Sequence, residues 1–145
     1  TETSPAITHT RPHDAPIDKS ETIGQPIPQV EVKIIDPVTG ATLPVDQPGE
    51  LCTRGFLVMM GYYDMPEATA ATVDADGWLH TGDLCSMDAR GFCRVTGRLK
   101  DMIIRGGENI YPREVEEVLY THPAVAEVAV VGLPVAAAAL AALAS

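Results

Sequence analysis

Asp83 and Arg98 are the two residues of this sequence whose types and spacing most directly suggest ligand binding. They stand on either side of the connection "DARG" at 88–91, where an aspartate opens and a glycine closes a β-turn between paired strands. A four-residue loop places Asp83 opposite Thr96, and a three-residue loop with a bulge places it opposite Gly97. In both registers, we expect the carboxylate and the guanidinium at the same end of the hairpin.

A carboxylate beside a guanidinium suits a sugar phosphate. The carboxylate can accept two hydrogen bonds from a vicinal diol, and the arginine can donate to the same sugar or to a phosphate. Gly82 and Gly97 flank the pair and leave room for a ligand. Each charged hydrogen bond would contribute about 1.5–3 kcal/mol, whereas a plain surface ion pair contributes about 0–1 kcal/mol. Spacing alone favours the plain ion pair.

The stretch "GRLKDMIIRGGENIYP" at 97–112 combines glycines and charges but matches no phosphate-binding loop. Its Gly106-Gly107 pair is not part of a GxGxxG pattern, and no Lys-Ser or Lys-Thr follows it. Taken alone, the pair predicts a tight turn ahead of a helix, and Lys100-Asp101 is an unspecific charged pair.

The elements that must position these residues follow from periodicity and turn chemistry. Residues 1–29 contain five prolines and little periodicity, so we expect this segment to be rich in loops. We expect strands at 30–35 and 49–55, a short helix at 65–73 and the hairpin at 77–98. A helix should begin near 111, and the apolar run after Pro123 should form a strand up to about 134. The predicted fold class is α+β, with a β-rich part followed by one helix and one strand.

Composition limits the class of protein. The 145 residues carry a formal net charge of −10, which argues against a nucleic-acid surface because phosphate contacts need clustered Lys and Arg. Cys52, Cys85 and Cys93 show no metal-binding spacing, so we expect free thiols in a reducing cytoplasm and a cytoplasmic location. No apolar run before the Ala-rich tail at 135–145 is long enough to span a membrane.

Three extended motifs in register carry a resemblance to a known family. The motifs are "GELCTRGFLVMMGYYDMPEAT" at 49–69, "WLHTGDL" at 78–84 and "GRLKDMIIRGGENIYPREVE" at 97–116. Together they closely resemble the adenylate-forming, or AMP-binding, superfamily of acyl-CoA synthetases, adenylation domains of nonribosomal peptide synthetases, and luciferases. Thr1-Glu2 is similar to the end of its "YGxTE" motif. The resemblance covers residues 1 to about 134, and fatty-acyl-CoA synthetases are the most similar members.

The resemblance implies an AMP-forming acid–thiol ligase that needs ATP, Mg²⁺ and coenzyme A. Such enzymes join a carboxylic acid to ATP, release pyrophosphate and transfer the acyl group from the adenylate to coenzyme A. By resemblance, Thr1 contacts the α-phosphate, Glu2 holds Mg²⁺, Asp83 binds the ribose hydroxyls, and Arg98 assists at the ribose or phosphate.

The resemblance also implies two domains. Residues 1–99 correspond to the end of an N-terminal AMP-binding domain, 100–101 to a hinge at Lys100, and 102–134 to the start of a C-terminal domain. The loop of Gly106, Gly107 and Glu108 would line the path of coenzyme A, and the Ala-rich tail at 135–145 has no assigned role. The family's phosphate loop and C-terminal catalytic lysine have no counterpart in this sequence, so we expect a fragment without a catalytic residue and without ligase activity alone.

Other functions stay open from the sequence. One is an adenylation domain that loads a carrier protein, another is an aryl-CoA ligase, and a third is a non-catalytic nucleotide-binding module. The expected partners are a small carboxylic acid, ATP and coenzyme A, with no nucleic acid and no integral membrane segment. The sequence leaves a homo-oligomer open.

Overall fold

A computed structural model describes residues 2–133, so Thr1, Pro134 and the Ala-rich tail at 135–145 lie outside the described residues. The chain divides into two compact units, Thr1–Leu99 and Lys100–Ser145, each considered by itself below. No helix among the described residues is both long and apolar enough to cross a membrane.

Short helices stand between groups of antiparallel strands along the chain. In chain order they are β1 (Thr8–His9), α1 (Pro16–Glu21), β2 (Gln25–Pro26), β3 (Val30–Ile35), β4 (Gly49–Gly55), α2 (Pro66–Thr72), β5 (Leu79–Met87), β6 (Cys93–Arg98), a 3-10 helix (Leu99–Asp101), β7 (Ile103–Arg105), β8 (Glu108–Ile110) and α3 (Pro112–Tyr120). This sheet-dominated mixture confirms the α+β fold class.

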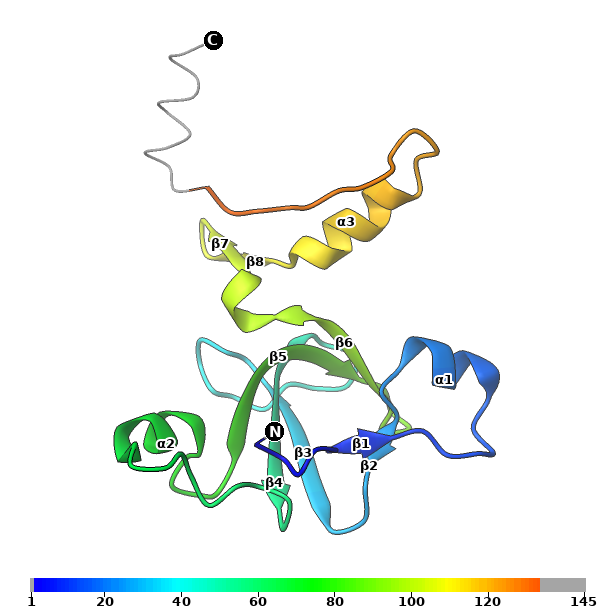
Figure 1. Cartoon of the computed structure of the whole chain (residues 1–145). Coiled ribbons are helices and arrows are strands. Elements are labelled where there is room, and N and C mark those ends of the chain that lie inside the picture. Colours follow the sequence, from blue (N-terminus) through cyan, green and yellow to red (C-terminus); the bar gives the residue numbers. More distant parts are fainter. Residues whose placement is uncertain (1, 134–145) are drawn as a thin grey trace. The chain divides into compact units, whose positions relative to one another are not determined.

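A four-stranded antiparallel sheet in the order β3-β4-β5-β6 forms the centre of the first unit (Figure 1). Its strands follow one another along the chain, so each pairs with the next. Ile34, Leu51, Cys85 and Cys93, one from each strand, form a buried cluster on the sheet. Burial of such side chains contributes roughly 25 cal/mol per Å² of apolar surface removed from water.

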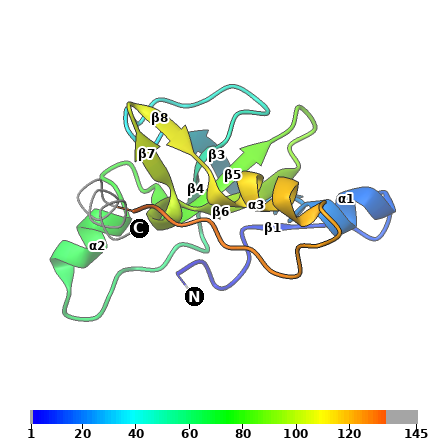
Figure 2. The ribbon, with the colours of Figure 1, turned by 90° about the horizontal axis from the view of Figure 1, so that it is seen from above.

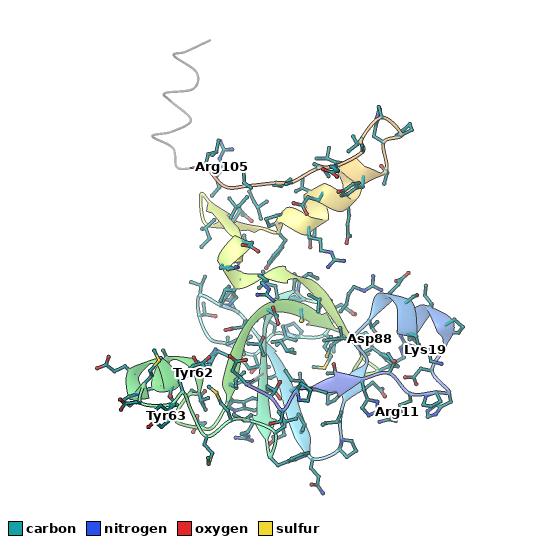
Figure 3. The ribbon with its side chains drawn as sticks, in the orientation of Figure 1. Arg11, Lys19, Tyr62, Tyr63, Asp88 and Arg105 are labelled. Carbon is teal, nitrogen blue, oxygen red and sulfur yellow. The ribbon has the colours of Figure 1, made fainter. Side chains whose placement is uncertain are left out.

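The first 29 residues are more ordered than the sequence predicted. They contain α1 and the two-stranded β1–β2 ladder, and α1 begins at Pro16 because proline suits the first helical position. Asp18 is buried and receives two hydrogen bonds, of 3.0 and 2.9 Å, from the Arg90 guanidinium in the β5–β6 turn. Figure 3 labels Lys19 on α1 and Asp88 in that turn. The segment is loop-rich, as expected, but the sequence analysis missed these short elements because their tertiary contacts are not visible in local periodicity.

The second unit contains the β7–β8 hairpin and α3 (Figure 2). Gly106 and Gly107 connect the two strands with φ angles of +62° and +89°, a conformation that suits glycine and matches the twist of a two-residue hairpin turn. The turn was therefore predicted, but the hairpin around it was not. Helix α3 begins at Pro112, close to the expected start.

The strand predicted after Pro123 is absent from the described residues up to 133. Instead, the backbone N–H of Val130 donates to the Glu116 carboxylate (2.8 Å), and that of Val128 donates to the Tyr120 hydroxyl (3.4 Å). These donors are satisfied by side chains of α3 rather than by a neighbouring strand. A β-rich run forms a ladder only where another strand offers an unpaired edge.

Burial keeps the three cysteines in the neutral thiol form. All three are free and buried. Burial raises the pKa of Cys52 and of Cys85 to about 12 and that of Cys93 to about 11, from an ordinary value of 9.0.

We predict that alkaline pH weakens the first unit through these thiols. Above pH 9.0, the unfolded chain loses thiol protons that the folded chain keeps, so the free energy of unfolding falls as pH rises toward about 11. Each thiol contributes at most about 1.4 kcal/mol per pH unit. The free energy of unfolding can be measured by urea unfolding followed through Trp78 fluorescence. Between pH 8 and 10.5 it should fall less steeply for Cys85→Ala than for the unsubstituted chain. Equal slopes would contradict the assignment.

Candidate active site

A cleft of about 660 Å³ opens in the first unit beside the four-stranded sheet. Its apolar wall includes Ile7, Leu51 and Leu79, and its polar lining includes Glu2, Asp83 and Arg98. Three residues to which the sequence analysis gave roles at a nucleotide therefore line one cleft. Segments from the N-terminus, β5 and β6 contribute them.

Asp83 and Arg98 are directly opposite each other across β5 and β6. The Arg98 Nε lies 3.4 Å from the Asp83 Oδ1, with side chains 65% and 40% exposed. Both predicted registers, with Asp83 opposite Thr96 or Gly97, were wrong, because a bulge between Leu84 and Cys85 leaves Thr96 as an extra residue on β6. The prediction that carboxylate and guanidinium share one end of the hairpin is confirmed.

The segment with Glu2 is fixed against the loop between β4 and α2. The Tyr62 hydroxyl donates to the Glu2 Oε1 (3.2 Å), and the Met59 N–H donates to the Glu2 carbonyl oxygen (2.9 Å). Figure 3 labels Tyr62 and Tyr63 in this loop. Tyr62 also lines the cleft, a position that the sequence analysis missed because "MMGYY" offers no spacing that separates packing from binding. Thr1, the predicted phosphate contact, lies outside the described residues.

The remaining predicted residues belong to the second unit. Lys100 is exposed in the 3-10 helix Leu99–Asp101, and the boundary between the compact units falls just before it. Gly106, Gly107 and Glu108 are exposed around the β7–β8 turn. A Cβ built on either glycine meets no atom within 4 Å, so the positive φ angles alone explain glycine within this unit.

One group of described residues, Glu50, Cys52 and His80, brings three potential metal-ligand atoms within 4.8 Å of one another. The His80 Nδ1 donates to the Glu50 Oε2 (2.9 Å), and the other carboxylate oxygen accepts the Gly82 N–H (3.0 Å). Burial and the Glu50 charge raise the pKa of the Cys52 thiol to about 12. These contacts describe a hydrogen-bonded cluster of a carboxylate, an imidazole and a neutral thiol.

The cleft combines groups for holding an anionic sugar derivative. Asp83 accepts hydrogen bonds, Arg98 supplies a permanent positive charge, and Glu2 adds a second carboxylate that could share a cation with a phosphate. The opposed carboxylate and guanidinium suit the binding and orientation of such a ligand.

Comparison of this sequence with known proteins finds AMP-binding enzymes and acyl-CoA ligases. Residues 1–63 match the family model described as AMP-binding enzyme. YngI of Bacillus subtilis (strain 168), named as a candidate acyl-CoA synthetase, is 58% identical over 134 residues, which are 92% of this chain and 24% of YngI. The human medium-chain acyl-CoA ligase ACSF2, mitochondrial, is 47% identical over 133 residues, 92% of this chain and 22% of that protein.

Solved structures of nucleotide-bound enzymes are similar to this chain as well. The O-succinylbenzoate coenzyme A synthetase MenE from Bacillus subtilis, in complex with AMP, matches with a TM-score of 0.76 and 41% identity, covering 92% of this chain and 27% of MenE. ATP-bound MatB from Rhodopseudomonas palustris matches with a TM-score of 0.73 and 40% identity, covering 79% of this chain and 23% of MatB. The chain is a relative of the AMP-binding, adenylate-forming enzymes, and it spans about a quarter of the length of those it matches. The resemblance read from the sequence is confirmed.

We predict that Asp83 contributes little to folding. Its ion pair with Arg98 is long and solvent-exposed, so Asp83→Asn should change the free energy of unfolding by less than about 1 kcal/mol. Asp18→Asn is the matched control, because Asp18 is buried against Arg90 and its change should cost about 1–3 kcal/mol. Urea unfolding of the two variants checks the difference. A larger loss for Asp83→Asn would mean that the pair is structural.

Proposed function

We propose that this chain forms part of an AMP-forming acyl-CoA ligase, called the parent ligase below. The ligase joins a carboxylic acid to ATP, which gives an acyl-adenylate and pyrophosphate. It then transfers the acyl group to the thiol of coenzyme A and releases AMP. The opposed Asp83 and Arg98 in the cleft carry this proposal, and the AMP-bound and ATP-bound structures among the relatives support it.

The geometry suits the ribose and phosphate of the nucleotide. The direct contact between Asp83 and Arg98 is long, at 3.4 Å, and exposed to solvent, so a ligand can replace it at little cost. The Asp83 carboxylate would accept the two ribose hydroxyls, and the Arg98 guanidinium would donate to the ribose or a phosphate. Each charged hydrogen bond contributes about 1.5–3 kcal/mol when solvent is excluded.

Glu2 has the chemistry of a Mg²⁺ ligand. Mg²⁺ in nucleotide sites is held by one or two carboxylates together with the substrate's phosphates and water. Glu2 brings one carboxylate to the cleft, and the Tyr62 hydroxyl orients it. The ion would neutralise phosphate charge during displacement of pyrophosphate. The proposed contact of Thr1 with the α-phosphate adds to this group.

The second half-reaction involves the other compact unit. We propose the boundaries 1–99 for the end of an N-terminal domain, 100–101 for a hinge, and 102–134 for the start of a C-terminal domain. Lys100 lies in a single 3-10 turn at the boundary, where a change of backbone angles disturbs little packing. Gly106, Gly107 and Glu108 would line the path of coenzyme A. The 145-residue chain alone is expected to lack ligase activity.

The acid is proposed to be a fatty acid. The support is the identity with proteins named as medium-chain acyl-CoA ligases. Relatives that act on O-succinylbenzoate and anthranilate keep an aryl-CoA ligase as the second candidate. Loading of a carrier protein and a non-catalytic nucleotide-binding module are further alternatives. A cytoplasmic location is proposed from the free thiols.

We predict that the parent ligase releases pyrophosphate with fatty acids. Incubation of the parent ligase with ATP, Mg²⁺ and a panel of fatty, aryl and amino acids, followed by pyrophosphate detection, tests the choice. Fatty acids should give the highest kcat/KM. Release only with aryl or amino acids would overturn the fatty-acid assignment, and release with none would favour the non-catalytic module.

The Asp83→Ala variant tests the nucleotide site. Loss of one charged hydrogen bond, worth about 1.5–3 kcal/mol, should raise the KM for ATP by about 10- to 150-fold. Glu31→Ala, which changes an exposed carboxylate of β3 paired with Arg54, should leave this KM unchanged. An unchanged KM in Asp83→Ala would contradict the clamp.

We predict that Lys100→Pro separates the two half-reactions. Proline fixes φ and should restrict rotation at the boundary while leaving the cleft of the first unit intact. Acyl-adenylate formation should persist, and formation of the acyl-CoA thioester should fall by at least about tenfold, whereas Lys100→Ala keeps both. Rates of pyrophosphate release and thioester formation are measured separately. An equal loss of both in Lys100→Pro would contradict the hinge.

A further inference from the structure

The backbone around Asp83 departs from a regular sheet on the side of β4. Glu50 pairs with Leu84 and Cys52 pairs with His80, so Thr81, Gly82 and Asp83 of β5 stand opposite the single residue Leu51. β5 lies between β4 and β6 (Figure 1), so this bulge is inside the sheet rather than at its edge. Bulges beside functional sites commonly redirect one side chain.

Side chains replace the ladder hydrogen bonds that the bulge removes. The Glu50 Oε1 accepts the Gly82 N–H (3.0 Å), where Gly82 has a φ of +70°. The Thr81 hydroxyl donates to the Leu51 carbonyl oxygen (2.8 Å) and accepts the Asp83 N–H (3.1 Å). The peptide groups on both sides of Gly82 are thereby fixed, and they set the direction in which the Asp83 side chain leaves the strand.

Glu50 is an unusual residue for this position. It is 5% exposed, and an ionised carboxylate with so little contact with water is stable only when its oxygens accept hydrogen bonds. Its second oxygen accepts a hydrogen bond from the His80 Nδ1 (2.9 Å), and the His80 Nε2 faces Asp74 (4.0 Å). Both oxygens are therefore used, one to fix the backbone before Asp83 and one to fix Glu50 itself.

We propose that Glu50 is a positioning residue for the nucleotide site. By holding the Gly82 N–H, its carboxylate keeps the bulge in the one arrangement that directs Asp83 into the cleft beside Arg98. Glu50 does not contact the nucleotide. This inference rests on the proposed function, because it matters only if Asp83 binds the ribose.

Variants of Glu50 in the parent ligase test the proposal. Glu50→Gln keeps an oxygen that can accept the Gly82 N–H, so it should retain a KM for ATP within about threefold of the original. Glu50→Ala removes the acceptor and should raise the KM for ATP by about tenfold, with kcat and the KM for coenzyme A within about twofold. If Glu50→Ala does not fold, Glu50→Asp keeps the charge but withdraws it by one methylene, and it should raise the KM for ATP in the same way. An unchanged KM for ATP in the folded variants, or an equal change of all constants, overturns the proposal.

A double-mutant cycle separates this proposal from the nucleotide clamp. Asp83→Ala alone tests the clamp, and a normal KM for ATP there means that the proposed function has failed. If Asp83→Ala raises that KM and Glu50→Ala acts through Asp83, the double variant should have the same KM as Asp83→Ala. Independent, multiplied effects would show that Glu50 acts elsewhere and would overturn the positioning role alone.

Discussion

The register of β5 against its two neighbours is the constraint on which the candidate site depends. On one side, three residues of β5 oppose the single residue Leu51, and on the other side Thr96 is an extra residue of β6. The irregularity on the β6 side places Asp83 opposite Arg98, and the one on the β4 side shapes the backbone around Gly82. Without the extra residue Thr96, the ladder between β5 and β6 would be regular and Asp83 would face a different residue of β6.

Apolar contacts stabilise the central sheet, whereas polar contacts fix the backbone at the candidate site. Apolar side chains of all four strands form the buried cluster that holds the strands together, and they leave the exact register to be decided by hydrogen bonds. Glu50 and Thr81 decide it around Asp83. Changes at these two polar groups are therefore expected to alter the direction of the Asp83 carboxylate, whereas changes in the apolar cluster act on the stability of the whole sheet.

Much of this architecture could be predicted from the sequence, and the exceptions have physical reasons. Residues 30–35 and 49–55 form the expected strands because alternation and flanking turns are local signals. Helix α1 and the strand expected after Pro123 were misjudged, because both depend on partners distant in sequence. Asp83 and Arg98 were found through residue type and motif resemblance. Glu50 was not, because a single acid in an apolar strand gives no spacing from which a role can be read.

The contacts between the N-terminal segment and Cys93 have a consequence for the behaviour of the chain in concentrated solution. β6 is an outer strand, and the Ile23 N–H donates to the Cys93 carbonyl (2.8 Å) while the Cys93 N–H donates to the Gly24 carbonyl (2.9 Å). On the opposite margin, the Leu43 N–H donates to the Ile34 carbonyl of β3 (2.9 Å). Unpaired strand margins recruit other chains into aggregates. The chain's own loops thus cover part of each margin, at Cys93 of β6 and at Ile34 of β3, and these positions are closed to a strand from a second molecule.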